Sequence, residues 1–315
     1  MIELDKKIYV SGHNGMVGSA IVRFLKGSGY KNIITASRKE LELTNQLEVN
    51  NFFKLNEIDV VFNAAAKVGG IVSNTNYPGD FILKNLMIQA NLLDASIRSE
   101  IDRFIFLGSC CIYPKYCDQP MKEEYLLTGN LEPTNEPYAI SKIAGIISCQ
   151  ALYQQYGLKS VCPMPINLFG KGDNLHPENS HIIAGLMRRL HFAKINEEET
   201  TIVWGSGVVK REYMHVDDCA EAIVFVSDQF DNGEIINIAP GTELTTRETA
   251  EVIADVVGYK GKLVQDTTKP DGTMRKLACS KKIKSLGWEP KLDFYEALTV
   301  TYEDFKEEIL SGRWD

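Results

Sequence analysis

The first half of the chain alternates short apolar runs with segments of helical spacing, and no other feature limits the fold as much. Runs bounded by polar residues or glycine, as buried parallel strands are, span Lys7–Ser11, Asn32–Ser37, Ile58–Asn63, Arg103–Leu107 and Lys159–Cys162. Helical spacing covers Met16–Leu25, Gln46–Leu55, Phe81–Ile97 and Tyr138–Tyr156. Strict alternation of strand and helix predicts an α/β fold with a doubly wound parallel sheet and right-handed crossovers.

The alternation loosens after about Phe169. Residues 170–179 are rich in Gly, Asn, Asp and Pro, which predicts a loop. The later elements that we expect are helices at His181–Lys194, Asp217–Ser227, Thr246–Val257 and Phe294–Leu310, and a strand at Thr201–Gly205. Thr245 and Glu248 form a capping-box pattern at the start of one helix. We therefore expect a second, smaller domain folded against the first, with the loop near their cleft.

Composition and charge exclude several classes of partner. The formal net charge is −8 and no block of five Lys or Arg occurs, so no nucleic-acid partner is expected. No apolar run reaches the ~18 residues that span a bilayer, and the N-terminal segment lacks a secretory apolar stretch. We therefore expect a cytoplasmic protein with no membrane partner. Seven cysteines without a C-x-x-C pair predict reduced thiols, most of them in the core, and no metal site.

Gly12, Gly15 and Gly18 follow the first predicted strand and open the first predicted helix. Glycine in such a turn lets the backbone approach a pyrophosphate, whose charge the helix N-terminus then meets. The alternative is a tight turn with a purely structural role. The position of the triplet between strand and helix favours dinucleotide binding.

The end of the second predicted strand indicates which dinucleotide binds. An acidic residue there would accept a hydrogen bond from the ribose of NAD, but the chain has Ser37-Arg38-Lys39. Two cations suit the 2′-phosphate of NADPH. The alternative is a solvated basic turn.

Tyr138 and Lys142 lie four residues apart on a predicted helix, and therefore on one face. Such a pair also arises by chance as a surface contact. Ser109 ends the fourth predicted strand, at the sheet edge where ligands bind in this class of fold. We expect Lys142 to hold the ribose and lower the pKa of Tyr138, which supplies the proton that accompanies the hydride. Ser109 would hydrogen-bond the substrate oxygen.

Several longer stretches carry a resemblance to a known family. They are Gly12–Ala20, Ala64–Ile71, Gly108–Pro114, Leu131–Tyr138, Asp173–His181, Val203–Gly207, Arg211–Asp218 and Lys269–Lys276. Through them, the chain resembles the GDP-L-fucose synthase family of the extended short-chain dehydrogenase/reductases over essentially its whole length. The resemblance implies an NADP-binding Rossmann-like domain at 1–168. It implies a mainly GDP-sugar-binding domain at 169–315, with some segments returning to the first domain.

The resemblance also implies an activity: NADPH-dependent reduction of the C4 ketone of a GDP-4-keto sugar, with 3,5-epimerisation. Ser109, Tyr138 and Lys142 match the reductase triad, and Cys111 and His181 match the pair that moves protons beside the ketone. Thiol and imidazole suit this work because both titrate near neutral pH. From the residues alone, a core thiol and a helix-capping histidine were equally good interpretations.

The same resemblance assigns the binding residues. For NADPH they are Gly12, Asn14, Gly15, Met16, Val17, Gly18, Arg38, Ala64, Leu107, Gly108, Lys142, Pro165, Asn167, Leu168 and His181. For the GDP-sugar they are Arg189, Trp204, Arg211, Asp271 and Lys276. Without the family, Arg189 and Lys276 would read as a solvated face. Phe81–Ile97 and Tyr138–Tyr156 are apolar on more than one face, and the resemblance implies a homodimer built from such helices.

Some positions depart from the pattern of the family. They are Asn14, Cys110, Ile166, Phe169, Lys171, Gly185, Met274 and Cys279. Asn14 replaces an arginine near the 2′-phosphate, and several of the others line the expected sugar pocket. The sugar therefore stays open, and a C4-reductase of another GDP-4-keto sugar, such as a GDP-heptose, is the alternative. A more distant alternative is a non-catalytic NADPH-sensing regulator on the same fold.

Overall fold

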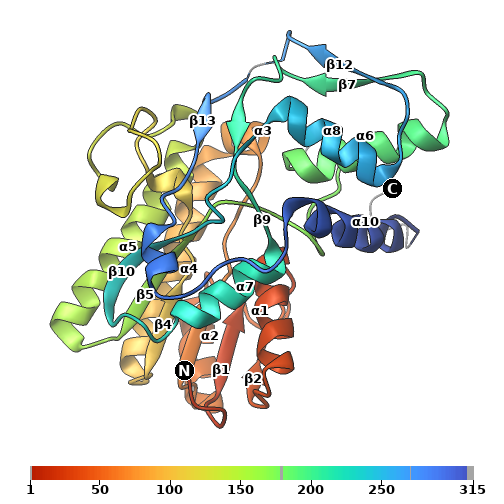
Figure 1. The fold of residues 1–315 in the computed structure, drawn as a ribbon. Helices are drawn as coiled ribbons and strands as arrows, with labels where there is room; N and C mark the ends of the chain where they lie inside the picture. Colours follow the sequence, from red (N-terminus) through yellow and green to blue (C-terminus); the bar gives the residue numbers. More distant parts are fainter. Residues whose placement is uncertain (1, 178–179, 270, 311–315) are drawn as a thin grey trace.

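A six-stranded parallel sheet forms the centre of the computed structural model, which describes residues 2–177, 180–269 and 271–310. Its strands, in spatial order, are β10 (Asn232–Ile238), β5 (Ser160–Pro165), β4 (Arg103–Phe106), β3 (Val60–Asn63), β1 (Ile8–Ser11) and β2 (Ile33–Ile34). The chain winds outward from β1 in both directions (Figure 1). The predicted doubly wound parallel sheet is confirmed.

The strand order reverses beside β1. This strand pairs with β2 on one side and with β3 on the other, where Ser11 lies opposite Asn63. Strands β1 and β3 therefore end together at the carboxyl edge of the sheet. In doubly wound sheets this switch point forms the ligand crevice.

Helices cover both faces of the sheet. One face carries α2 (Gln46–Asn56), α4 (Pro78–Arg98) and α5 (Glu136–Tyr156), and the other carries α1 (Met16–Gly27) and α7 (Val216–Val226), which pack side by side (Figure 1). The pleat of β1 divides its side chains between the two cores, because Tyr9 packs with the first set and Ile8 and Val10 with the second.

A third core lies beyond the carboxyl edge. It is formed mainly by α6 (Ile182–Ile195), α8 (Thr246–Val257) and α10 (Phe294–Leu310), which lie away from the N-terminus (Figure 1). The parallel pair β7 (Thr200–Trp204) and β12 (Lys262–Asp266) packs beside them. The predicted capping box is confirmed, since Thr245 Oγ1 accepts from the Glu248 backbone and the Glu248 carboxylate accepts from the Thr245 backbone.

Shorter elements connect the cores. The remaining strands and helices are β6 (Asn167–Phe169), paired with β9 (Tyr213–His215), β8 (Lys210–Arg211), lying between β11 (Leu244–Thr245) and β13 (Arg275–Lys276), α3 (Ile71–Asn76) and α9 (Lys281–Ser285). Among the described residues, the 3₁₀ turns are η1 (Cys110–Ile112), η2 (Glu123–Tyr125) and η3 (Pro133–Asn135). In the described ranges, no helix combines the length and apolar character that a membrane span requires.

One expected element is shorter in the structure. The predicted strand Asn32–Ser37 is short, since only Ile33–Ile34 pairs with β1 and Ser37 accepts turn hydrogen bonds from Glu40 and Leu41. The second half of the chain supplies β10 to the sheet and α7 to its face. The division at residue 168 stays a prediction. Of the motif positions quoted above, Glu178, Asn179 and Pro270 lie outside the described residues.

Candidate active site

The glycine turn after β1 is built for close backbone contact. Gly12 has φ +74°, and a Cβ there would lie 2.8 Å from the Ala65 backbone. A Cβ on Gly18 would lie 2.2 Å from the Gly12 carbonyl oxygen. Gly15 precedes the first turn of α1 as its N-cap. The chain therefore leaves room at the helix N-terminus, which fits the pyrophosphate of a dinucleotide.

A cavity of about 340 Å³ lies at the carboxyl edge of the sheet. It brings together thirteen of the residues predicted for the site: Met16, Val17, Ala64, Leu107, Gly108, Ser109, Cys111, Tyr138, Lys142, Pro165, Asn167, Leu168 and His181. They come from α1, the ends of β3 and β4, the start of α5, the β5–β6 segment and the residue before α6. Residues distant in sequence thus share one cavity, which we call the main cavity.

Tyr138 lies beside Ser109 in the main cavity. Burial raises the pKa of the Tyr138 phenol well above its ordinary value, and the electrostatic effect of the neighbouring Cys111 acts in the same direction. The hydrogen bond with Ser109 opposes both. The pKa of Tyr138 is therefore raised and not lowered as expected, because burial prevails over any effect of the Lys142 charge. The physical reason is desolvation of the phenolate.

Lys142 is 5 % exposed and donates a hydrogen bond to the Leu107 carbonyl oxygen at 2.7 Å. Its Nζ lies 5.9 Å from the centroid of the Tyr138 ring. Burial lowers the pKa of Lys142 to about 8. The ammonium group therefore lies near the tyrosine but is held by the backbone at the end of β4.

Cys111 and His181 both line the main cavity, although they lie seventy residues apart in the sequence. The Cys111 N–H donates to Ser109 Oγ at 3.3 Å. His181 occupies the N-cap position of α6, yet its side chain makes no capping hydrogen bond. Instead, His181 Nδ1 lies 3.4 Å from Asp173 Oδ1, and this hydrogen bond raises the pKa of the imidazole. Neither a core thiol nor a capping side chain describes these two residues.

The neighbouring thiol has a different environment. Cys110 packs against the sheet core, and its Sγ lies 3.6 Å from the Met164 carbonyl oxygen. Burial raises the pKa of Cys110 well above its ordinary value. Cys110 therefore resists ionisation to the thiolate, although it is adjacent to Cys111 in the sequence.

The residues predicted to contact the GDP-sugar lie outside the main cavity. The Arg189 guanidinium stacks over the Trp204 ring at 5.0 Å, and Asp271 Oδ1 accepts from the Ser206 N–H at 2.7 Å. Arg211 and Lys276 are directly paired across β8 and β13.

Lys276 also connects the two regions. It lines a smaller cavity of about 50 Å³ together with Ser109 and Cys111, which belong to the main cavity as well. Lys276 therefore lies at the wall of the smaller cavity, while the two arginines and the exposed Trp204 ring lie outside the main cavity. Residues of these types suit a nucleoside diphosphate.

Besides Gly12, Gly15 and Gly18 of the glycine turn, the cofactor candidates that do not line the main cavity are Asn14 and Arg38. Arg38 is exposed at 79 % of its side-chain surface and forms an ion pair with Glu42 at 2.9 Å. Asn14 is exposed in the glycine turn. Asn14 follows β1 and Arg38 follows β2, so both lie beyond the carboxyl edge of the sheet. They stay candidates for binding a part of the dinucleotide outside the main cavity.

Sequence reasoning missed four residues beside the catalytic candidates. Asn74, Asn135 and Tyr213 line the main cavity, and Asp173 contacts His181. Asn74 donates to the carbonyl oxygens of Gly69 and Gly70, which fixes the loop at the cavity wall. Asn135, Asp173 and Tyr213 lie within motifs quoted above and Asn74 lies just beyond one, and this proximity was the available signal.

Comparison with known proteins gives consistent relatives. The model of the NAD dependent epimerase/dehydratase family matches residues 8–239. GDP-L-fucose synthase 1 of Arabidopsis thaliana is 50% identical over 309 residues, which cover 98% of this chain and 96% of that protein. GDP-L-fucose synthase of Escherichia coli (strain K12) is 46% identical over 311 residues, with coverage of 96% and 97%.

A solved structure is also similar along the whole chain. It is MlghC, a GDP-mannoheptose C4 reductase from Campylobacter jejuni with NADP bound. The TM-score is 0.88 and the sequence identity 32%, and the match covers 97% of this chain and 100% of that one.

Proposed function

The chain belongs to the NAD dependent epimerase/dehydratase family, and to the GDP-L-fucose synthases within it, and from this premise we propose that it converts a GDP-4-keto sugar in two steps. It epimerises the carbons that flank the ketone and then reduces the ketone with NADPH. The observation that carries the proposal is one cavity lined by Ser109, Tyr138, Lys142, Cys111 and His181.

NADPH is the coenzyme that the residues favour. The glycine turn fits a pyrophosphate, and Arg38 offers a guanidinium at the end of β2 for the 2′-phosphate. When bound, this coenzyme supplies the hydride for reduction. Asn14 offers no charge at the position where relatives carry an arginine, so Arg38 is the main source of selectivity over NADH.

Two side chains serve the reduction at the C4 oxygen. Ser109 donates a hydrogen bond to the ketone oxygen and Tyr138 donates the proton that completes the alcohol. Because the pKa of the phenol is raised by burial, Tyr138 holds its proton at neutral pH and is ready to act as an acid. Lys142 contributes a positive charge that stabilises the phenolate left after transfer.

Cys111 and His181 serve the epimerisation. The C4 ketone acidifies the hydrogens on C3 and C5. The Cys111 thiolate removes one of them to give an enolate, and His181 returns a proton to the opposite face of that carbon. The contact with Asp173 keeps a proton on His181, which favours the imidazole as the acid of the pair.

The nucleotide part is held farther out. We assign the diphosphate to Arg189, Arg211 and Lys276, whose cations suit its negative charge. Trp204 offers an exposed ring for the base, and Asp271 faces the same end of β7.

Solvent labelling tests the two-step proposal. The enzyme is incubated with NADPH and GDP-4-keto-6-deoxymannose in deuterated water, and the product is analysed by NMR. Deuterium at C3 and C5 is the expected result. Reduction without deuterium would rule out epimerisation by this enzyme. If NADPH binds but is not consumed, a non-catalytic sensor would be the better description.

A second candidate function has a specific observation behind it. The similar solved structure is of a GDP-mannoheptose C4 reductase, and this chain departs from the fucose synthase pattern at Lys171 and Gly185 near His181. The alternative is reduction of a GDP-4-keto-heptose with little epimerisation. A heptose substrate reduced with a higher kcat/KM than the deoxyhexose would favour it.

We also propose a homodimer through α4 and α5. Leu83 and Met87 on α4 and Ile140 and Ile147 on α5 are exposed, although the two helices pack against each other. Their spacing puts each pair on one helix face. Sedimentation of the wild-type chain should give twice the monomer mass, and Leu83→Lys with Ile147→Lys should give monomers. A cytoplasmic location stays a prediction.

A further inference from the structure

His181 lies at a helix end that disfavours its charged form. It immediately precedes α6, and its side chain is 47 % exposed at the wall of the main cavity. The positive end of the helix dipole favours neutral imidazole. A histidine that delivers a proton needs the charged form, so a nearby anion has to offset the helix.

Asp173 is the anion that contacts His181. It is 5 % exposed, and its Oδ1 lies 3.4 Å from His181 Nδ1 and accepts from the Asn174 N–H at 2.7 Å. Its Oδ2 is buried and has no hydrogen-bond partner among the described residues. Because a carboxylate oxygen accepts, the contact places a hydrogen on His181 Nδ1, which donates it to Asp173. Nε2 is then the nitrogen available to a substrate.

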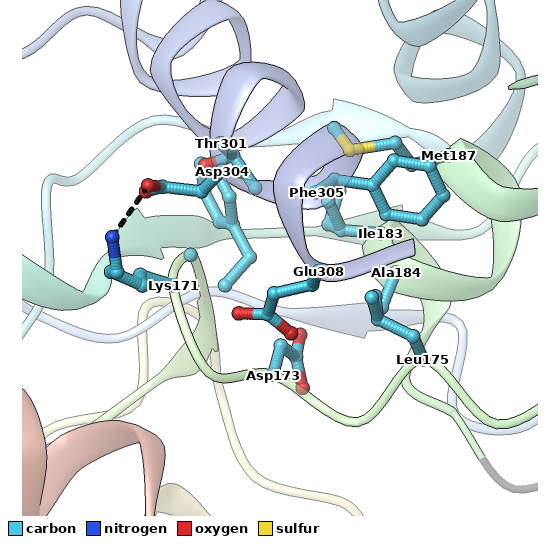
Figure 2. Close-up of a pocket in the computed structure, with 12 residues that line it drawn as sticks. Lys171, Asp173, Leu175, Ile183, Ala184, Met187, Thr301, Asp304, Phe305 and Glu308 are labelled. Atoms are coloured by element: carbon cyan, nitrogen blue, oxygen red, sulfur yellow. Dashed lines mark hydrogen bonds and ion pairs between the residues drawn. The ribbon is translucent and has the colours of Figure 1, made fainter. Parts of the chain in front are cut away.

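The loop that carries Asp173 is fastened to the C-terminal helix at the two preceding positions. The Lys171 ammonium pairs with Asp304 at 2.9 Å, as Figure 2 shows, and the Gly172 N–H donates to Glu308 Oε1 at 3.0 Å. Asp304 and Glu308 are four residues apart, so both carboxylates extend from one face of α10. Lys171 is one of the positions where this chain departs from its family.

The loop and α10 fit together closely. The turn bends at Gly170 and Gly172, which have φ +136° and +83°. Only about 10 Å³ of space remains between the loop, α6 and α10, which is about the room of one water molecule. Phe305 of α10 is buried at this contact (Figure 2). The position of Asp173 is therefore set by the C-terminal helix.

We propose that Asp173 is a positioning residue for His181, held in place by Asp304 and Glu308 of α10. The inference deepens the proposed epimerisation and rests on it, because it explains how the loop keeps the acid of the pair protonated. It also extends the active site to a helix whose own side chains are absent from the main cavity in the described part of the chain.

Charged and titratable groups surround His181 on two sides. On the loop side they are Lys171, Asp173, Asp304 and Glu308, and in the main cavity they are Cys111, Tyr138, Lys142 and Tyr213. The variants below change only the loop side, so any shift they cause is attributable to that side.

Proton NMR titration tests the proposal without substrate. The chain has five histidines, and the His181 signal is assigned by its loss in His181→Gln. Asp173→Asn keeps the size and one acceptor but removes the charge, and should lower the pKa of His181 by about one pH unit. Asp304→Asn with Glu308→Gln should lower it by a smaller amount, because Asp173 remains but is less firmly held.

The matched control is Glu303→Gln. It removes one carboxylate from the same helix, where Glu303 pairs with Lys306 at 2.7 Å, and should leave the titration of His181 unchanged. Unchanged NADPH affinity in Asp173→Asn, in Asp304→Asn with Glu308→Gln and in Glu303→Gln, measured by fluorescence, shows that the fold is retained. An unshifted pKa of His181 in Asp173→Asn overturns the proposal.

Solvent exchange provides the functional arm. In Asp173→Asn, the alkaline limb of the deuterium-incorporation profile should move to lower pH by the same amount as the NMR pKa. A uniform loss of exchange at all pH values with no shift would indicate a merely structural role for Asp173 and overturn the proposal. If the wild-type enzyme exchanges no deuterium, the proposed epimerisation fails, while the NMR titration still decides the role of Asp173.

Discussion

The ammonium group of Lys142 donates a hydrogen bond to the backbone carbonyl of Leu107, with Nζ and O 2.7 Å apart. Leu107 follows β4, and Lys142 lies in the second turn of α5. The bond therefore ties the sheet edge to the helix that carries Tyr138. Because an ammonium group has three hydrogens, two remain for the hydroxyls of a ribose.

The charge of Lys142 should control activity at alkaline pH. Burial lowers the pKa of Lys142 to about 8, against an ordinary value of 10.5, so the ammonium form declines above that pH. If that form holds the ribose and stabilises the phenolate, kcat/KM for NADPH should fall by about tenfold per pH unit above the pKa. Lys142→Arg keeps its charge and should lose this limb while its maximal rate drops. An identical limb in the variant would assign the titration to another group.

Tyr138→Phe should separate the two proposed reactions. The variant lacks the proton donor for C4, so reduction should fall by about 10² to 10⁴-fold. Cys111 and His181 remain, so deuterium should still enter the unreduced sugar at C3 and C5. The measurement combines coenzyme consumption with NMR of the recovered substrate. Loss of both reactions together would show that Tyr138 also serves the epimerisation.

Gly18→Ala should abolish coenzyme binding. The added Cβ would lie 2.2 Å from the Gly12 carbonyl oxygen, a distance that forces the backbone of the turn to move. We expect a loss of at least about 100-fold in NADPH affinity, measured by fluorescence titration, which corresponds to about 2.7 kcal/mol. Unchanged affinity would mean that the turn is not the pyrophosphate site.

Gly27→Ala is the matched control for that variant. It introduces the same methyl group into the same helix, but nothing lies within 4 Å of the new Cβ. Coenzyme affinity should be unchanged. Stability should rise by about 0.5 to 1 kcal/mol, because alanine is the better helix former.

Arg38→Ser should reduce the preference for NADPH. Arg38 is the cation at the end of β2, and Asn14 brings no second charge. The KM for NADPH should rise by about tenfold and that for NADH should hardly change, because NADH has no 2′-phosphate. Lys39→Ser is the control and should have a smaller effect. Equal losses with both coenzymes would show that Arg38 supports the fold of the turn instead.

The sequence was sufficient where a local pattern decides the structure. The Gly12–Gly18 turn and the buried runs of β1 and β3 follow from residues within one short segment. By contrast, β10 joins the sheet by pairing Asn232–Ile238 with Ser160–Pro165, about seventy residues earlier. Nothing within either segment specifies the other as its partner.

The candidate site divides in the same way. Tyr138, Lys142 and Ser109 were found because spacing and strand ends place them at one edge. The raised pKa of Tyr138 could not be predicted, since it depends on burial by the whole cavity wall. The contact of Asp173 with His181 likewise depends on α10, which packs on the loop from the far end of the chain.

Glu212 should make the stability of the protein depend on pH. Its side chain is buried, with 0% exposure, and accepts the N–H groups of Gly241 at 2.5 Å and Ala278 at 2.8 Å. Burial raises its pKa to about 7, against 4.5 in the ordinary state, so the folded chain binds the proton more tightly than the unfolded chain. The tighter proton binding therefore adds about 3 kcal/mol to the free energy of unfolding below pH 4.5. This stabilisation is lost as the pH rises through about 7. Glu212→Gln cannot titrate, so urea unfolding at pH 5 and at pH 7 should show a smaller difference in the variant than in the wild type. Equal differences in the two proteins would assign the pH dependence to other groups.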